Sequence, residues 1–71
     1  MKIYTTGETI INLDKVCFVR NYHSEIRFCF DGKDNYKDIS FGTIDPDTDE
    51  FIPDYEKTDR EFNKILKIMA E

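Results

Sequence analysis

Apolar and polar residues alternate through residues 16–31, and this alternation limits the possible folds more than any other feature of the sequence. Five apolar side chains in this region occupy even-numbered positions, namely Val16, Phe18, Ile26, Phe28 and Phe30. Under the two-residue period of a β-strand they all point to one face. We therefore predict an antiparallel hairpin of residues 16–22 and 25–31, in which Val16 lies opposite Phe30 and Phe18 lies opposite Phe28.

Turn residues divide the rest of this half of the chain into further short strands. Gly7 separates residues 2–6 from residues 8–13. Because glycine has no side chain, it accepts the positive φ that a tight hairpin turn requires. After a polar turn, residues 36–42 resume the alternation and form one more predicted strand.

The end of the chain changes to a helical period. An amphipathic helix is predicted over residues 59–70, and its apolar stripe comprises Phe62, Ile65, Leu66 and Met69. Thr58 and Glu61 have the spacing of a capping box at its start. We expect the stripe, with Leu66 in the core, to pack on the face that carries Phe18, Phe28 and Phe30.

The predicted fold is a single α+β domain, residues 1–71. It is an antiparallel β-meander of about five to six short strands within residues 2–52, with one C-terminal helix on one face.

The size and charge of the chain narrow its function. A chain of 71 residues buries only roughly 60% of the surface that its unfolded form exposes, so it holds one small core. Residues 1–42 carry six bases and six acids, whereas the remaining residues carry four bases and nine acids and account for the whole net charge of −5. A net-negative chain without a basic stripe is a poor match for nucleic acid or an anionic membrane. We expect the partner to be another protein with a basic surface.

No segment has the form of a catalytic centre, and we expect neither enzymatic activity nor a cofactor. His23 is the only histidine and lies beside Ser24 in a predicted loop, but a triad needs spatial reach and an orienting acid. Cys17 and Cys29 become cross-strand neighbours in the predicted register, yet two cysteines in a reducing compartment are no disulfide framework. The first residues lack the apolar stretch of a secretory signal, so a cytoplasmic location is expected.

Residues 44–52 have two interpretations. Pro46 suits the second position of a type I turn and Asp49 suits the left-handed conformation behind it, which together are typical of a small acidic hairpin. Carboxylates also fall at four ligand positions of an EF-hand calcium loop, from Asp45, Asp47, Asp49 and Glu56. Against calcium, Glu50 occupies the position where that loop needs glycine, and the preceding segment is predicted as a strand. The hairpin is favoured, and calcium binding is kept as an alternative.

Eight acids fall between residues 45 and 61. Such a run is usually a solvated surface, and its functional interpretation is a binding surface for a basic partner. The candidate partner-binding residues are Asp45, Asp47, Asp49, Glu50, Asp54 and Glu56. In composition the chain resembles small acidic phage proteins that inhibit nucleases and restriction systems. That resemblance implies an alternative function, in which the acids imitate nucleic acid and occupy a DNA- or RNA-binding protein.

A second resemblance rests on residues 7–16, in which a glycine turn leads into Ile11-Asn12-Leu13-Asp14-Lys15-Val16. This segment is similar to one in short bacterial β-rich domains of the flagellar and swarming-motility accessory type. The resemblance implies a similar topology, no enzymatic activity, and a structural role for Asn12 and Asp14 as caps of a turn between two strands. The chain departs from that family in its longer loop at residues 34–36 and in its acidic segment, residues 45–56.

These observations predict a small non-enzymatic cytoplasmic protein-binding module of bacterial or phage type. It is expected to act through the acidic surface or through an exposed strand edge, because a short meander leaves two edges with unpaired backbone groups. Pairing of such an edge with its symmetry mate also favours a homodimer. The alternatives are an acidic nucleic-acid-mimicking inhibitor and a calcium-binding protein with a degenerate EF-hand-like loop.

Overall fold

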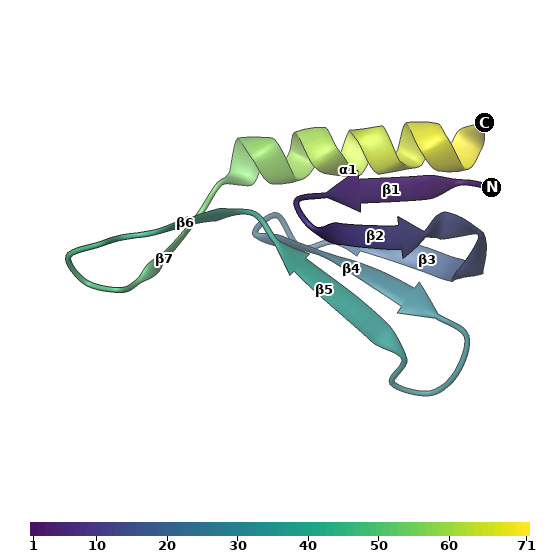
Figure 1. The fold of residues 1–71 in the computed structure, drawn as a ribbon, viewed down its shortest axis with the longest axis horizontal. Helices are drawn as coiled ribbons and strands as arrows, with labels where there is room; N and C mark the ends of the chain where they lie inside the picture. Colours follow the sequence, from purple (N-terminus) through teal and green to yellow (C-terminus); the bar gives the residue numbers. More distant parts are fainter.

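The computed structural model describes all residues from Met1 to Glu71 and consists of seven short strands followed by one helix (Figure 1). The strands and a 3-10 turn are, in chain order, β1 Ile3–Thr6, β2 Thr9–Asn12, η1 Leu13–Lys15, β3 Val16–Asn21, β4 Glu25–Phe30, β5 Tyr36–Ser40, β6 Gly42–Ile44 and β7 Phe51–Pro53. The helix α1 is Tyr55–Ala70. The predicted α+β class with a C-terminal helix is confirmed, with slightly more strands than predicted.

The strands form three small antiparallel sheets instead of one continuous meander. Their orders are β1-β2, β3-β4-β5 and β6-β7, so every paired strand is a neighbour in sequence. The break after β2 has a local cause, because the side chain of Asn12 accepts a hydrogen bond from the backbone N–H of Asp14 at 3.0 Å and turns the chain into η1. Gly7 takes the predicted positive φ, at 53°, in the turn between β1 and β2.

The β3–β4 hairpin keeps one predicted pair and loses the other. Val16 lies opposite Phe30 as predicted, but a β-bulge follows, so that Phe18 lies opposite Cys29 and Val19 lies opposite Phe28. A bulge adds one residue to a strand and moves the residues after it to the opposite face. Phe18 is therefore 48% exposed, whereas Val19 packs against the core. The prediction that Phe18 belongs to the buried face is wrong.

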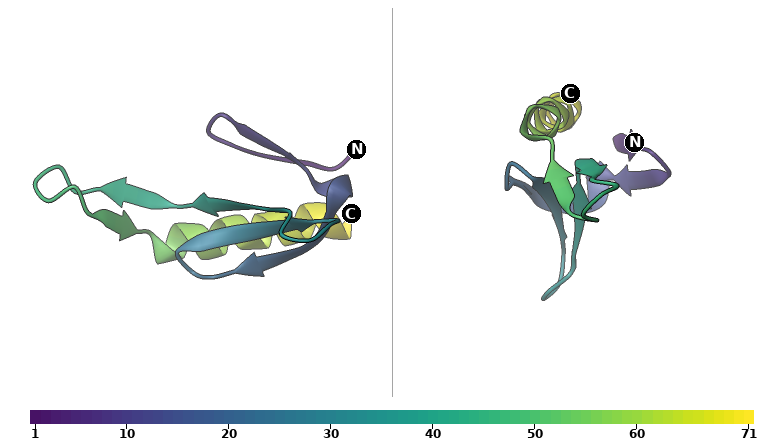
Figure 2. Two further views of the ribbon diagram at one scale, coloured as in Figure 1. Left: turned by 90° about the horizontal axis from the view of Figure 1, so that it is seen from below. Right: turned by 90° about the vertical axis from the view of Figure 1, so that its left-hand side faces the viewer.

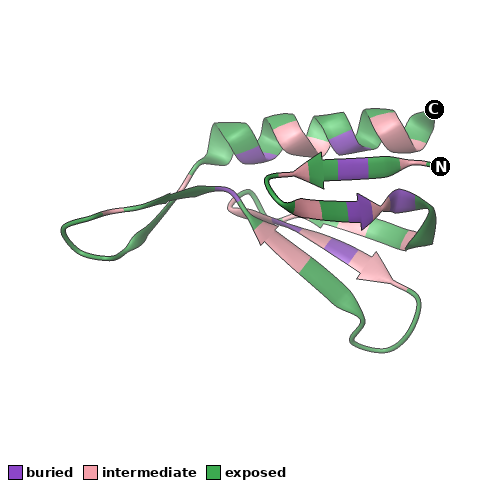
Figure 3. Ribbon diagram, viewed as in Figure 1, coloured by how far each residue is buried: buried purple, intermediate pink, exposed green.

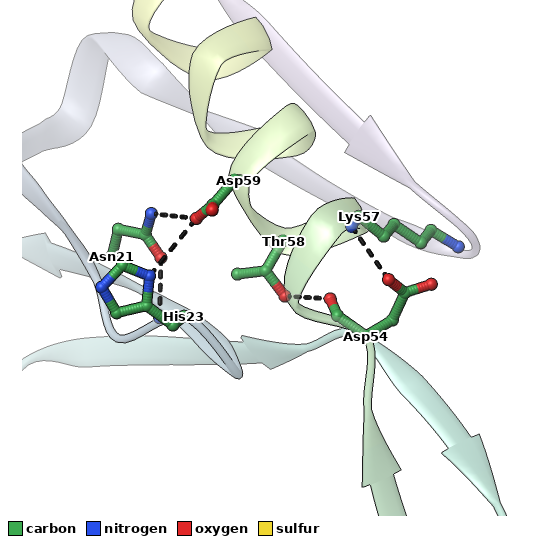
Figure 4. Close-up of polar contacts among 6 residues, drawn as sticks. All are labelled: Asn21, His23, Asp54, Lys57, Thr58 and Asp59. Carbon is green, nitrogen blue, oxygen red and sulfur yellow. Dashed lines mark hydrogen bonds and ion pairs between the residues drawn. The ribbon is translucent and has the colours of Figure 1, made fainter.

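The helix begins at Tyr55, about one turn before the predicted start at residue 59. Asp54 is its N-cap, because the Asp54 side chain accepts a hydrogen bond from the backbone N–H of Lys57 at 3.0 Å. Thr58, the predicted cap, lies inside the first turns and is fully buried. Its hydroxyl donates to the backbone carbonyl of Asp54 at 2.8 Å (Figure 4).

The core lies between α1, the β1–β2 hairpin and one face of the β3–β4–β5 sheet (Figure 3). It contains seven buried apolar side chains: Tyr4, Ile11, Leu13, Ile26, Phe28, Phe41 and Ile65. Of the predicted helical stripe only Ile65 is fully buried, and Leu66 is 45% exposed. The buried line of α1 runs through Thr58 and Ile65, which are seven residues apart and so share one face. The prediction of Leu66 as a core residue is therefore wrong.

Polar contacts also hold β1 against α1. The Tyr4 ring stacks on Phe28 with 5.9 Å between the centroids, and its hydroxyl donates to Glu61 Oε1 at 2.8 Å. Burial and the neighbouring Glu61 carboxylate raise the pKa of the Tyr4 hydroxyl. Lys2 Nζ donates to the backbone carbonyl of Met69 at 2.8 Å, near the negative end of the helix dipole.

No helix in the structure combines the length and apolar character that a membrane span requires.

The β6–β7 hairpin, residues 42–53, projects from the rest of the molecule, and we call it the arm (Figures 1 and 2). The remainder, residues 1–41 and 54–71, is called the body. The arm contains no buried residue. The molecule measures 41 × 26 × 21 Å and has a Cα radius of gyration of 13.0 Å. A compact chain of this length would have about 11 Å, so the arm makes the molecule elongated.

Candidate protein-binding arm

The arm is a regular hairpin whose turn is organised by its own acidic residues. Gly42 pairs with Pro53, Thr43 with Ile52, and Ile44 with Phe51. In the turn, the Asp45 side chain accepts a hydrogen bond from the backbone N–H of Asp47 at 2.9 Å. The N–H of Asp49 donates to the Asp45 carbonyl at 2.8 Å, and Asp49 has the predicted left-handed backbone with φ 58°. The hairpin interpretation of residues 44–52 is therefore confirmed.

Large apolar side chains are exposed on both faces of the arm. Ile44 is 60% exposed, Phe51 44% and Ile52 51%. Ile44 and Phe51 share one face as a cross-strand pair, while Ile52 points to the other. An isolated two-stranded hairpin is marginally stable in water, because it buries no apolar surface of its own. Covering these side chains with a partner would remove apolar area from water and stabilise the arm.

A groove of about 310 Å³ lies where the arm joins α1. Its walls are formed by residues 42–43 and 52–56, and they include the exposed ring of Tyr55. Gly42 is needed on one side, since a Cβ atom there would meet the Ile52 carbonyl and approach the Phe51 ring to 2.7 Å. The Phe51 ring therefore packs directly over Gly42, where a larger residue fits only if a neighbour shifts.

The six predicted partner-binding residues fall into two groups. Asp45, Asp47, Asp49 and Glu50 all lie in the turn of the arm, with the last three exposed. Asp54 and Glu56 lie exposed at the start of α1, where both line the groove. None of the six forms an ion pair, since the two ion pairs of the chain are His23–Asp59 and Arg27–Asp38. The acidic tip therefore has no cation of the same chain to neutralise it.

Asp54 has a structural task in the helix. As the N-cap of α1 its side chain accepts a backbone hydrogen bond, as the Asp45 side chain does within the turn, so its carboxylate is not free for a partner in the way that those of Asp47, Asp49 and Glu50 are. A mutation at this position would weaken the helix as well as any binding surface.

The calcium alternative gains no support from the geometry. No group of three or more histidine, cysteine or acidic side chains is arranged so that it could hold a metal ion. Asp45 already accepts a hydrogen bond within the turn, and Glu56 belongs to the helix beyond it.

The two cysteines are not cross-strand neighbours. The predicted register places Cys17 opposite Cys29, but Cys17 lies in the β-bulge and Phe18 is opposite Cys29. Both thiols are free.

Asn21, His23 and Asp59 form a small polar cluster between the β3–β4 loop and α1 (Figure 4). Asn21 Nδ2 donates to Asp59 Oδ1 at 2.9 Å, and His23 Nδ1 lies 3.4 Å from the same oxygen. The hydrogen bond from Asn21, aided by His23, lowers the pKa of the Asp59 carboxyl. His23 is exposed with φ 69°, and the cluster ties the loop to the helix.

The structure reveals a second exposed surface that the sequence did not predict, on the side of the β3–β4–β5 sheet opposite the core. The exposed rings of Phe18, Tyr22 and Tyr36 lie there. Arg27 donates to both oxygens of Asp38 at 2.8 and 3.0 Å, and its guanidinium lies 4.1 Å from the centroid of the Tyr36 ring. The Arg27 hydrogen bonds lower the pKa of the Asp38 carboxyl. The sequence did not indicate this surface because the predicted register places Phe18 in the core.

Function has to be inferred from these surfaces themselves. The resemblance of residues 7–16 to flagellar accessory domains stays a prediction, although Asn12 does cap a turn as that resemblance implied. Comparison with known proteins finds no matching family model, no similar curated protein and no similar solved structure.

Proposed function

We propose that the chain is a small non-enzymatic protein-binding module of bacterial or phage type, that it acts in the cytoplasm, and that the arm is its binding element. One observation carries this proposal: the arm projects from the body with apolar side chains exposed on both faces and, at its tip, four acids that form no ion pair. Exposed apolar surface rimmed by polar groups is typical of interaction sites.

The two kinds of side chain have separate tasks in binding. Ile44, Phe51 and Ile52 would anchor the complex, because burying them releases water from apolar surface. The acids of the turn would steer a basic partner toward the arm and select against acidic ones. The partner is accordingly a protein with an apolar groove flanked by lysine or arginine.

The experiment is a capture of partners from the native host, followed by titration of the captured protein with an arm variant. The variant is Asp47→Lys with Glu50→Lys. Asp54 is left unchanged because it caps the helix, and Asp49 because its positive φ disfavours lysine. The matched control, Glu8→Lys with Asp31→Lys, makes the same charge change at exposed turns of the body.

The arm variant is expected to weaken binding at least about tenfold, and wild-type binding is expected to weaken as salt shortens the screening length below about 10 Å. The control should bind like wild type. A partner that binds the arm variant as well as wild type would refute the proposal. Competition by an oligonucleotide for a nucleic-acid-binding partner would instead favour the mimic alternative.

A further inference from the structure

We propose that the arm binds a second copy of this chain, by docking on the exposed surface of its β3–β4–β5 sheet. We call that surface the outer face and define it by Phe18, Arg20, Tyr22, Arg27 and Tyr36. The inference rests on the proposed function, since it names the partner of the arm.

The outer face has the composition of an interface centre. Aromatic residues and arginine are enriched at the cores of protein interfaces and among the residues that contribute most to affinity. Here they line a hollow of about 280 Å³, with Cys29 beside them. Phe18 is 48% exposed, Tyr22 42% and Tyr36 49%.

The outer face is also held in place before any partner arrives. Asp38 fixes the Arg27 guanidinium through two hydrogen bonds. The same guanidinium lies over Tyr22 and Tyr36, at 5.3 and 4.1 Å from their ring centroids. Side chains that are already ordered lose little conformational entropy on binding, so more of the contact energy appears as affinity.

One charge of the outer face lacks a counter-ion. Arg20 and Arg27 lie directly opposite each other on β3 and β4, and like charges in this position repel. Asp38 pairs with Arg27, whereas Arg20 has no carboxylate at ion-pair distance and lies over the Phe18 ring at 5.4 Å. An acidic group from outside would complete the cluster. The arm supplies such groups next to apolar side chains that match the exposed rings.

A second copy supplies both halves of this contact in equal number. Each chain leaves one acidic, apolar arm and one outer face uncovered. If two chains exchange arms about a twofold axis, both contacts form at once and no arm or face is left over. Such a dimer would stabilise the folded chain by mass action. The core of only seven buried side chains supplies little stability on its own.

The test is a pair of charge reversals measured by sedimentation at high micromolar concentration. Wild type is expected to have twice the 8.5 kDa mass of one chain. Arg20→Glu on the outer face and Glu50→Arg on the arm should each weaken the dimer at least about tenfold, because each replaces an attractive charge pair by a like-charge pair in both contacts. Mixed in equal amounts, the two variants should dimerise again, since the arm with Glu50→Arg then meets the face with Arg20→Glu and the native arm meets the native face.

Lys37→Glu and Glu8→Arg are the matched controls, because both residues are exposed and lie outside the arm and the outer face. Both controls should dimerise like wild type, and circular dichroism should show that all variants are folded. A monomeric wild type, single variants that dimerise normally, or a mixture that stays monomeric would overturn the inference. If wild type is monomeric while a captured protein still depends on Asp47 and Glu50, only this inference fails and the proposed function stands.

Discussion

The body and the arm are both built from antiparallel hairpins, yet they differ in what covers their strands. The β1–β2 hairpin lies under α1 and contributes Tyr4 and Ile11 to the core. The β6–β7 hairpin has the same kind of apolar residues, Ile44, Phe51 and Ile52, and all are exposed. A strand pair becomes a stable part of a fold when another layer removes its apolar face from water. The arm lacks that layer within its own chain, which is why it is the candidate for a layer supplied by a partner.

The most damaging single substitution is expected in the body, at Ile65. Ile65→Ala should destabilise the fold by about 2–5 kcal/mol, because a fully buried side chain leaves a cavity when it is truncated. Leu66→Ala is the matched control, since the neighbouring side chain is 45% exposed and should cost clearly less. Urea unfolding followed by circular dichroism measures both. Equal losses would mean that the helix packs through a different face.

A smaller effect is expected at the base of the arm. Gly42→Ala adds a Cβ atom that meets the Ile52 carbonyl and the Phe51 ring, and such overpacking costs about 1–3 kcal/mol unless a strand moves. We expect β7 to shift away from β6. Amide hydrogen exchange should then quicken in residues 42–53 and stay slow in β4. Thr43→Ala, at the next position of the same strand, should leave the exchange of the arm nearly unchanged, and an unaltered arm in Gly42→Ala would contradict the predicted clash.

The junction of body and arm is tested by the N-cap. Asp54→Ala should cost about 0.5–2 kcal/mol, because the Lys57 N–H loses its hydrogen-bond acceptor. Asp47→Ala, in the turn of the arm, should change stability by less than about 0.5 kcal/mol, as exposed positions usually do. Thermal melts of the two variants give the comparison. Were both changes neutral, Asp54 would belong with the free acids of the tip.

The smallest effect concerns pH and the Asn21–His23–Asp59 cluster. Because the pKa of Asp59 is lower in the folded chain than its ordinary value of 3.8, its contribution to stability is complete above pH 3.8 and is lost as the pH falls through the folded pKa. Asp59→Asn should therefore lose less stability than wild type on acidification below that pH. Asp31→Asn, an exposed acid whose side chain makes no hydrogen bond, should follow the wild-type curve. If stability falls equally with pH in wild type and Asp59→Asn, the cluster adds nothing to the stability of the fold.

Much of the fold followed from local patterns, whereas the two candidate surfaces followed only in part. The acids of the arm were predicted from their spacing, and Pro46 and Asp49 correctly indicated a hairpin. The projection of that hairpin was not predicted, because nothing local says whether another element will cover a strand pair. The outer face was missed since it depends on a bulge at Cys17, which no residue type in that segment announces.

Neighbouring residues alone account for the two-residue period of the strands, the positive φ at Gly7 and Asp49, and an amphipathic C-terminal helix. Which side of each element is buried depends instead on contacts between elements that are distant in the sequence. In the folded chain Phe18 is exposed and Val19 faces the core, Ile65 is buried while Leu66 is exposed, and no element covers the arm. A periodic pattern constrains one element, whereas burial depends on where distant elements meet, and a single extra residue in a strand is enough to exchange its two faces.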